Sequence, residues 1–468
     1  MKILLISPKF KPMGLESFVS GYTIGSGILS VAAAARDAGH EVAVELGNEE
    51  NILTLLKTHS PDMVGITCLT VSYPVAKTMI TMIKEYNPDI LTIIGGHHAT
   101  FMTEEIFSEC DVDYVLRGEG ESAFPLLLHH IESGNKYPLI EGVAFKREGK
   151  IFNKHSFTLL QNIDSLPKIT TDLVPGEIHS FVPQISSSRG CPFRCSFCSI
   201  SAFYKGRWRK RKPETILDEI DMYASEGHGT FKFDDDNLTV DTTRVREICD
   251  NLKERGLDNL KWGCLSRVDS ICRDPAMVDE MVDAGCSWMQ LGIESGVQEI
   301  INTYKKHITL EQVRKAVKIM NDSSVFHTWF SIIGSGNKYD QPKYIEKNIN
   351  FLKKIKFDLL QISILTPFPG TELYCKLKEE NRLLHKNWKR YDCVHCVYQP
   401  LYVTPQQIEE YFLRAYRSIY ASRGLDLLKM ARKGLKSGSI ITPEMLFKTT
   451  KYGIDIILGR KNLYETLE

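Results

Sequence analysis

The sequence predicts an α/β protein built from two successive series of β/α units and a smaller helical region at its C-terminal end. From residue 2 to about residue 132, short apolar runs alternate with segments whose apolar residues recur every three or four positions. A second series of the same kind runs from residue 183 to residue 364. Alternation of this kind favours parallel sheets covered by helices.

The first series contains five predicted strands, each a short apolar run. The helices between them, such as Ile28–Ala38 and Pro74–Glu85, carry apolar residues at three- and four-residue spacing. The strands are Lys2–Ile6, Glu41–Leu46, Asp62–Thr67, Ile90–Ile94 and Asp113–Leu116. Five successive units predict a doubly wound, flavodoxin-like domain over residues 1–140. Such a domain binds its ligand beyond the carboxyl ends of the strands, where the strand order switches.

The loops at those strand ends combine glycines with small hydroxyl residues. Glycine lets the backbone approach a bulky ligand closely, and hydroxyl groups supply donors for phosphate or amide groups. An ordinary set of turns would explain a single Gly-Gly pair equally well. The residues are Thr67, Thr70 and Ser72 after the third strand, Gly95-Gly96-His97-His98-Ala99-Thr100 after the fourth, and Arg117-Gly118-Glu119-Gly120-Glu121 after the fifth.

The second series follows a polar, irregular stretch at residues 141–180, which we expect to be a linker. Six strands alternate with helices at residues 213–225, 241–255, 275–284, 297–304, 310–321 and 341–355. The strands are Pro183–Ser188, Thr230–Asp234, Leu260–Leu265, Trp288–Ile293, Phe326–Ile333 and Leu359–Ile364. Residues 376–468 are expected to form the small helical C-terminal region.

A cysteine motif follows the first strand of the second series. Cys191, Cys195 and Cys198 have the spacing C-x3-C-x2-C. Three thiolates at this spacing can hold three irons of a [4Fe-4S] cluster and leave the fourth iron open, which indicates catalysis rather than simple electron transfer. Structural zinc normally takes four ligands in paired blocks, and no second block lies nearby.

The motif and its position in a loop after a strand resemble the radical S-adenosylmethionine (SAM) superfamily, in which SAM chelates the open iron. Together with Gly-Gly-His-His-Ala-Thr and Arg-Gly-Glu-Gly-Glu, the motif resembles the cobalamin-binding radical SAM family over most of the chain. The resemblance implies that residues 181–375 form a partial (β/α)6 barrel whose chemistry lies at the carboxyl ends of its strands.

For the first domain, the resemblance implies cobalamin binding near the nucleotide tail and the corrin. Cobalamin domains that ligate cobalt through a protein histidine carry Asp-x-His-x-x-Gly after the first strand. This chain has Ser7-Pro8-Lys9-Phe10-Lys11-Pro12-Met13-Gly14 there, without a histidine. The cobalt would therefore lack a protein imidazole on its lower face. We expect His97 and His98 to bond locally or to contact the corrin edge. The residues implied for cobalamin are Thr67, Thr70, Ser72, Gly95, Gly96, His97, Ala99 and Thr100.

For the barrel, the resemblance implies SAM contacts at four strand ends. Asp235 and Asp236 are expected at the SAM amino group, although an exposed loop or helix-capping carboxylate is the plain alternative. Arg267 is expected at the SAM carboxylate. Glu294 and Ser295, in Gly292-Ile293-Glu294-Ser295-Gly296, are expected at SAM or its ribose. Gly334-Ser335-Gly336-Asn337 departs from the family's Gly-x-Pro-Gly-Glu-Thr, so its contact with SAM stays open.

The implied activity is methyl transfer. In that reading, a SAM-derived methyl group moves through methylcobalamin to an unactivated carbon, with a 5′-deoxyadenosyl radical abstracting hydrogen. The alternative is cyclisation, oxidation or rearrangement with the same cofactors, as in the oxygen-independent porphyrin ring cyclases. A methylthiotransferase needs three further cysteines upstream, and only Cys68 and Cys110 precede Cys191. A cobalamin sensor with a relic barrel is disfavoured by the intact cysteines, Arg267 and Glu294. No catalytic residue is named from the sequence.

Composition bounds the partners and the compartment. The chain has 468 residues, with Lys+Arg and Asp+Glu both at 58, so nothing indicates a nucleic-acid partner. Twelve scattered cysteines without a transmembrane run or a signal peptide favour a cytoplasmic protein with reduced thiols. Cys393 and Cys396 are at most half a metal site.

The expected partners are a small-molecule, lipid or peptide substrate and a reducing electron donor of the flavodoxin or ferredoxin type. Residues 425–436 mix leucines with basic residues, and a second apolar patch follows at Ile454–Leu458. Helices that pack on the protein are the plain interpretation of these segments. Peripheral membrane contact by the C-terminal helices is the alternative.

Overall fold

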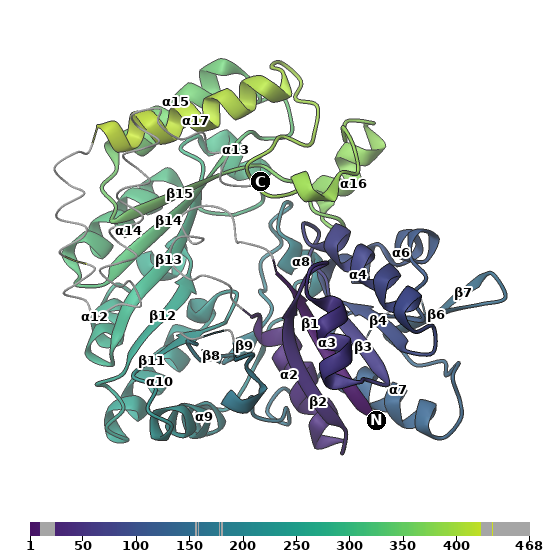
Figure 1. Cartoon of the computed structure of the whole chain (residues 1–468). Helices are drawn as coiled ribbons and strands as arrows, with labels where there is room; N and C mark the ends of the chain where they lie inside the picture. The colour runs from purple at the N-terminus through teal and green to yellow at the C-terminus, as the bar shows by residue number, and fades with distance from the viewer. Residues whose placement is uncertain are drawn as a thin grey trace. The chain divides into compact units, whose positions relative to one another are not determined.

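The computed structural model describes residues 1–9, 24–154, 157, 159–176, 178, 181–422 and 433. The described chain divides into two compact units (Figure 1). Unit 1 holds the described residues up to 181 together with Asn387–Lys389. Unit 2 holds Val182–Lys386 and the described residues from Arg390 onward.

Unit 1 contains a seven-stranded sheet in the order β2-β1-β3-β4-β5-β6-β7. The first five strands are parallel, which confirms the predicted doubly wound class. Their bounds are β1 Lys2–Pro8, β2 Glu41–Gly47, β3 Met63–Thr67, β4 Leu91–Gly95 and β5 Tyr114–Leu116. The strand order switches between β1 and β3, where this class of sheet binds its ligands.

Helices cover both faces of this sheet because alternate strand residues point to opposite sides. Ile3 and Leu5 of β1 pack into one core with α2 and α7. On the other face, Ile6 and the α4 residue Met79 both lie against Gly47 of β2. The helices are α2 Ser26–Asp37, α3 Ile52–His59, α4 Tyr73–Tyr86, α5 His97–Phe101, α6 Thr103–Glu109 and α7 Gly120–Glu132.

A hairpin extends the sheet beyond β5, inside the segment that the sequence predicted to be irregular. β6 (Val143–Arg147) pairs antiparallel with β5, and β7 (Lys150–Asn153) pairs antiparallel with β6. The two-residue connection, Glu148-Gly149, has φ of 52° and 77°. Two successive positive φ values match the tight turn that suits the twist of a hairpin. Glu-Gly between two short strands was the sequence signal that could have revealed it.

Unit 2 contains a six-stranded parallel sheet in the order β15-β14-β13-β12-β11-β8. Successive strands lie side by side, as expected for a partial (β/α)6 barrel. The strands are β8 Gln184–Ile185, β11 Thr230–Phe233, β12 Lys261–Ser266, β13 Cys286–Glu294, β14 Phe326–Ile333 and β15 Leu359–Ile364. The longer helices are α9 Pro213–Ser225, α10 Thr242–Glu254, α12 Ala276–Asp283, α14 Leu310–Asp322 and α15 Pro342–Lys354. Three shorter ones are α8 Ser199–Phe203, α11 Val268–Arg273 and α13 Gln298–Thr303.

The first predicted barrel strand, Pro183–Ser188, is divided in the structure. Only β8 joins the sheet, whereas β9 (Ser188–Arg189) pairs antiparallel with β10 (Arg209–Lys210). The backbone N–H of Ser187, between the two pieces, donates to Asp235 at 2.7 Å. At Ser187 the Asp235 side chain thus takes the place of a backbone acceptor of β11. The chain leaves the sheet at this point and continues toward the cysteine motif.

The region after the barrel begins with α16 (Glu372–Glu379) and ends, in the described part, with α17 (Pro405–Ala421). The open edge of β15 lies against α17 (Figure 1). The hydroxyls of Tyr416 and Tyr420 hydrogen-bond the backbone of Ile362 and Leu360 at 2.7–3.1 Å. Side-chain hydroxyls therefore satisfy an exposed sheet edge.

Several sequence predictions fall outside the described residues. They are the apolar–basic segment 425–436 apart from Lys433, the patch Ile454–Leu458, and residues 10–14 of the loop after β1. In the part of the chain that is described, no helix is both long enough and apolar enough to cross a bilayer.

Candidate functional site

The three cysteines lie in one loop, Gly190–Cys198, which we call the cluster loop; it joins β9 to α8. Burial raises the pKa of Cys191 to about 11, and the nearby Arg267 opposes the rise. The Cys198 thiol acts electrostatically on both Cys191 and Cys195, so the three sulfurs are neighbours. All three residues are partly exposed and none forms a disulfide. Soft thiol donors grouped in this way fit an iron–sulfur cluster.

No group of three or more His, Cys, Asp or Glu side chains in the described residues is arranged to hold a single metal ion. A cubane cluster spreads its protein ligands over different irons, so its thiols need not converge on one point. The donor set of the cluster loop is therefore compatible with a cluster.

Three contacts anchor the cluster loop to the rest of unit 2. The N–H of Ser196 donates to the carbonyl of Tyr304 at 3.0 Å, and the N–H of Leu373 donates to the carbonyl of Ser196 at 3.0 Å. The guanidinium of Arg267 stacks over the ring of Phe193, 3.6 Å from the ring centroid. The loop is thus held between the end of β12, the chain after α13, and α16.

Arg267 is buried and already has protein partners. Its Nε donates to Asp269 at 2.9 Å, and its Nη2 donates to the carbonyl of Lys306 at 2.7 Å. These contacts orient a fixed positive charge beside the cluster loop, as a site for an anionic group requires. Arg267 lies directly before α11, and its expected contact with the SAM carboxylate stays a prediction.

Glu294, at the end of β13, forms a buried ion pair with Lys306. The β13–β14 register shifts between Gly292 and Glu294, and Glu294 has a left-handed backbone with φ of 64°. A Cβ at position 292 would lie 2.1 Å from Glu294 Oε1 and 2.5 Å from Lys306 Nζ. A side chain at position 292 would therefore displace this ion pair, which fills the space beside the glycine.

Lys306 is a site residue that the sequence analysis missed. Burial raises the pKa of Cys195, and the cations of Lys306 and Arg267 oppose that rise. Lys306 lies between Lys305 and His307, whose φ values are 54° and 57°. Two left-handed residues around one buried lysine mark a backbone that is bent to aim this side chain inward. No spacing rule in the sequence would have revealed it.

The structure separates the two aspartates that the sequence treated as a pair. Asp235 is buried, and its carboxylate accepts the Ser187 N–H and the hydroxyls of Ser187 and Ser188. Asp235 thus shapes the chain between β8 and β9. Asp235 is thus a buried carboxylate, unlike the exposed loop carboxylate of the plain alternative, and its three hydrogen bonds leave little acceptor capacity for a ligand.

Asp236 instead borders the cluster loop. Its Oδ2 accepts the N–H of Gly190 at 3.1 Å. Burial, reinforced by Asp234 and Asp235, raises the pKa of Asp236 to about 7. A cationic group brought next to this carboxyl would favour its charged form.

Ser295 is fully buried, and its Oγ accepts the N–H of Val297 at 3.2 Å. This contact stabilises the turn between β13 and α13. In the described structure, the Ser295 hydroxyl therefore accepts a backbone hydrogen bond of this turn.

In unit 1, the predicted loops after β3, β4 and β5 are joined by backbone and hydroxyl contacts. Gly96 has φ of 101°, and a Cβ there would lie 2.8 Å from the Cys68 carbonyl oxygen and 3.3 Å from Thr67 Oγ1. Thr100 Oγ1 donates to the Gly96 carbonyl and accepts the N–H of Gly118. The structure thus brings the predicted residues of three strand ends together.

Not every predicted hydroxyl faces open space. Ser72 Oγ exchanges hydrogen bonds with the backbone of Leu69, so it closes a turn. Gly95 has more room, since a Cβ there would be 3.5 Å from Leu116. Thr70 and Ala99 are buried at the same loops.

His98 lies inside unit 1. Its ring stacks on Tyr73, with centroids 4.5 Å apart, and its Nδ1 is 3.4 Å from Thr70 Oγ1. Trp388 meets the same ring edge-on at 5.0 Å and donates to Glu105 at 3.0 Å. Burial lowers the pKa of His98 to about 3 and that of His97 to about 4. Both imidazoles are therefore neutral at physiological pH.

Cys393 and Cys396 are two separate thiols. Cys396 Sγ donates to the Tyr398 carbonyl at 3.4 Å, and burial raises the pKa of Cys393 to about 11. Neither takes part in a disulfide.

Comparison with known proteins agrees with this arrangement. Residues 19–128 match the B12 binding domain, and residues 185–347 match the radical SAM superfamily. The uncharacterized methyltransferase PH0819 of Pyrococcus horikoshii is 32% identical over 431 residues, which are 90% of this chain and 92% of that protein. The anaerobic magnesium-protoporphyrin IX monomethyl ester cyclase of Cereibacter sphaeroides is 26% identical over 444 residues, which are 91% of this chain and 71% of the cyclase.

Two solved structures share the fold. The radical SAM methyltransferase TsrM from Kitasatospora setae, with cobalamin and a [4Fe-4S] cluster bound, has a TM-score of 0.69 at 16% identity, covering 90% of this chain and 89% of TsrM. The cobalamin-dependent radical SAM enzyme OxsB has a TM-score of 0.69 at 16% identity, covering 100% of this chain and 83% of OxsB. The two domain matches and the relative aligned over most of both chains establish the family. The chain belongs to the cobalamin-binding radical SAM enzymes, whose cofactors are cobalamin, SAM and a [4Fe-4S] cluster.

Proposed function

We propose that this enzyme is a methyltransferase that moves a SAM-derived methyl group by way of cobalamin to an unactivated carbon of a small molecule. The observation that carries the proposal is the cluster loop with Arg267, Asp236 and the Glu294–Lys306 pair around it, in a chain that also has a B12 binding domain. The methyltransferase PH0819, which aligns with nearly the whole chain, supports this reaction class. When bound, the cofactors supply one-electron cleavage of SAM and a carrier for its methyl group.

The residues of unit 2 hold and orient the bound groups. Cys191, Cys195 and Cys198 are the cluster ligands. Around them, Asp236 accepts from the SAM amino group, Arg267 faces the SAM carboxylate, and Glu294 contacts the ribose. Lys306 fixes the Glu294 carboxylate in place. Asp235 and Ser295 support this site through the backbone, because their oxygens are already engaged.

The residues of unit 1 hold cobalamin at the ends of β3, β4 and β5. Small and glycine residues let a bulky ring approach the backbone. Ser72 and Thr100 act indirectly by shaping these loops. The contacting residues in this proposal are Thr67, Thr70, Gly95, Gly96, His97 and Ala99. The domain limits we propose are 1–140 for cobalamin and 181–375 for the radical SAM barrel.

The proposed partner is a one-electron donor of the flavodoxin or ferredoxin type, since the cluster must be reduced from outside. The proposed compartment is the cytoplasm. All twelve cysteines lie in the described part of the chain and none forms a disulfide, as expected for a reducing compartment.

A cyclase is the second candidate, because a porphyrin cyclase is also similar over most of the chain. The two functions differ in what becomes of SAM. Methyl donation leaves S-adenosylhomocysteine, whereas radical formation leaves 5′-deoxyadenosine and methionine. A methyltransferase of the proposed kind yields S-adenosylhomocysteine as well as 5′-deoxyadenosine and methionine. A cyclase yields only 5′-deoxyadenosine and methionine.

The test is to reconstitute the full chain anaerobically with iron, sulfide and cobalamin, to add reductant and SAM, and to quantify both adenosyl products. Cys191→Ala should abolish 5′-deoxyadenosine, and Cys375→Ala, at an exposed cysteine of α16, should not. 5′-Deoxyadenosine without S-adenosylhomocysteine would favour the cyclase. Neither product from a protein loaded with both cofactors would contradict the proposal.

A further inference from the structure

The turn after β14, Gly334–Asn337, departs from the family pattern, and the structure reveals what holds it. Gly334 and Gly336 have φ of 92° and 68°. A Cβ at position 334 would lie 2.5 Å from the hydroxyl of Tyr398. Glycine at 334 and tyrosine at 398 are thus fitted to each other, although 64 positions separate them in the sequence.

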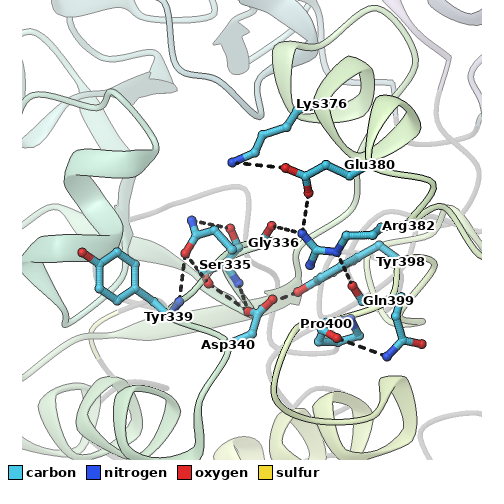
Figure 2. A network of polar contacts seen from close by, with 11 residues as sticks. Ser335, Gly336, Tyr339, Asp340, Lys376, Glu380, Arg382, Tyr398, Gln399 and Pro400 are labelled. Carbon is cyan, nitrogen blue, oxygen red and sulfur yellow. Dashed lines mark hydrogen bonds and ion pairs between the residues drawn. The ribbon is translucent and has the colours of Figure 1, made fainter.

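Asp340 is the centre of the contacts around this turn (Figure 2). Its side chain is fully buried, and its Oδ1 accepts the Ser335 N–H at 2.5 Å and the Ser335 hydroxyl at 2.9 Å. The Tyr398 hydroxyl donates to the same oxygen at 3.4 Å. Within the described residues, Oδ2 has no hydrogen-bond partner. Burial raises the pKa of Asp340, against the influence of Ser335 and Arg382.

Arg382 supports the other end of the turn. Figure 2 shows its guanidinium between the turn and the chain at Gln399. Nη1 donates to the Gly336 carbonyl at 2.9 Å, and Nε donates to the Gln399 carbonyl at 2.8 Å. Glu380 pairs with the same guanidinium at 2.8 Å. The segment after the barrel is therefore bound to the turn by a buried cation.

The carbonyl of Gly334 is the third backbone group of the turn that forms a hydrogen bond with a side chain. It accepts the hydroxyl of Tyr304 at 2.7 Å, and the Tyr304 carbonyl holds the cluster loop through Ser196. The backbone of the turn is thus engaged at Gly334 and Gly336 by side chains from two distant segments, and at Ser335 by the nearby Asp340. Because buried hydrogen bonds have defined geometry, such a turn has one conformation.

We propose that Asp340 is a positioning residue for SAM: it fixes the Gly334–Asn337 turn so that the turn forms one wall of the SAM site, with Tyr398 and Arg382 as its supports. The inference rests on the proposed function, because it requires SAM to bind at the carboxyl ends of the barrel strands. It assigns Asp340 to the turn itself and not to the reacting atoms. It also gives the segment after the barrel a part in SAM binding.

The test measures SAM affinity without turnover, by equilibrium dialysis on the reconstituted full chain in the absence of reductant. Asp340→Ala leaves the Ser335 donors unpaired and should weaken SAM binding about tenfold, while iron content stays that of the wild type. Asp340→Asn keeps an acceptor at Oδ1 and should bind SAM within about twofold of the wild type. Lys376→Ala is the matched control, because Lys376 is at the rim of the same network and, among the described residues, pairs with Glu380 alone, at 4.0 Å.

A folded Asp340→Ala protein with wild-type SAM affinity would overturn the proposal, and so would an Asn variant as weak as the Ala variant. If Asp340→Ala does not fold, Tyr398→Phe decides: weaker SAM binding supports the proposal and unchanged binding overturns it. A wild-type chain that carries its cluster and binds no SAM would instead refute the proposed function. The two failures are therefore distinguishable.

Discussion

At the scale of single residues, Lys306 and its neighbour Lys305 illustrate how local sequence and tertiary role can differ. Both are lysines in the run Tyr304-Lys305-Lys306-His307. Lys305 makes an exposed ion pair with Glu372, whereas Lys306 is buried against Glu294. Exposed pairs contribute little to stability, and breaking a buried pair leaves an uncompensated charge. Nothing in the dipeptide itself says which lysine turns inward.

Replacement of Lys306 by methionine should therefore destabilise unit 2 by about 3 kcal/mol, because the Glu294 carboxylate would be buried without its partner. Urea unfolding monitored by circular dichroism measures this loss. Lys305→Met is the matched control and should change the free energy of unfolding by less than about 1 kcal/mol. The double variant Lys306→Met/Glu294→Gln should recover part of the loss. Equal effects of the two single lysine variants would contradict the assignment.

His98 supplies a pH prediction at the same scale. Its pKa is lowered in the folded state by burial, so the unfolded chain binds the proton more readily. The stability contribution is complete above the unfolded pKa of about 6.5 and is lost as the pH falls toward 3. Between pH 7 and pH 5, the free energy of unfolding of unit 1 should fall by about 2 kcal/mol on account of this residue.

The measurement is urea unfolding at both pH values for the wild type and for His98→Gln. The variant should show the smaller loss between pH 7 and pH 5. His129→Gln, at an exposed position of α7, is the control and should retain the wild-type slope. A His98→Gln protein with the full wild-type slope would disprove the assignment.

At the scale of elements, α17 completes the barrel by a means that strand patterns do not reveal. An incomplete barrel leaves two edge strands with unpaired backbone groups, here β8 and β15. Here the hydroxyls of Tyr416 and Tyr420, one helical turn apart, each bond an N–H and a C=O of β15. The spacing of four residues places both rings on one face of the helix. The sequence predicted only a helical region over residues 376–468, and not that two of its tyrosines would hydrogen-bond the edge of a strand.

Removing these hydroxyls should show how much the unpaired edge of β15 destabilises the protein. Tyr416→Phe and Tyr420→Phe should each lower the free energy of unfolding by about 1–3 kcal/mol, because each leaves two buried backbone groups of β15 without a partner. Thermal and urea unfolding check this. Tyr411→Phe, on the same helix with its ring beneath the Arg414 guanidinium, should be neutral. Neutral behaviour of all three variants would show that water satisfies the edge.

At the scale of the whole molecule, two units with separate cores divide the cofactors between them. A ligand that binds only the native state stabilises the part of the chain that forms its site. Each cofactor should therefore protect its own unit. In our proposal, cobalamin binds at the loops after β3 and β4, and SAM with the cluster binds at the cluster loop, Glu294 and the turn after β14.

Hydrogen–deuterium exchange of the full chain can resolve these effects. Cobalamin added to protein without a cluster should slow exchange at residues 66–72 and 94–101, and leave residues 190–198 and 292–296 unchanged. A reconstituted cluster with SAM should produce the reverse pattern. With cobalamin at 100 times its dissociation constant, the protection in unit 1 should approach about 2.7 kcal/mol. Cobalamin protection confined to unit 2 would refute the division.

The sequence alone determined the class of both sheets, the positions of most of their parallel strands to within a few residues, and the cysteine spacing of the cluster loop. It could do so because these features are local. The spacing of apolar residues indicates which face of a helix or strand is buried, and the three cysteines lie within eight consecutive positions. Only the tertiary structure separated Asp235 from Asp236, selected Lys306 over Lys305, and joined Asp340 to Tyr398 and Arg382. Those choices depend on contacts between residues far apart in the chain, and hydrogen bonding and burial decide them only once the elements have packed.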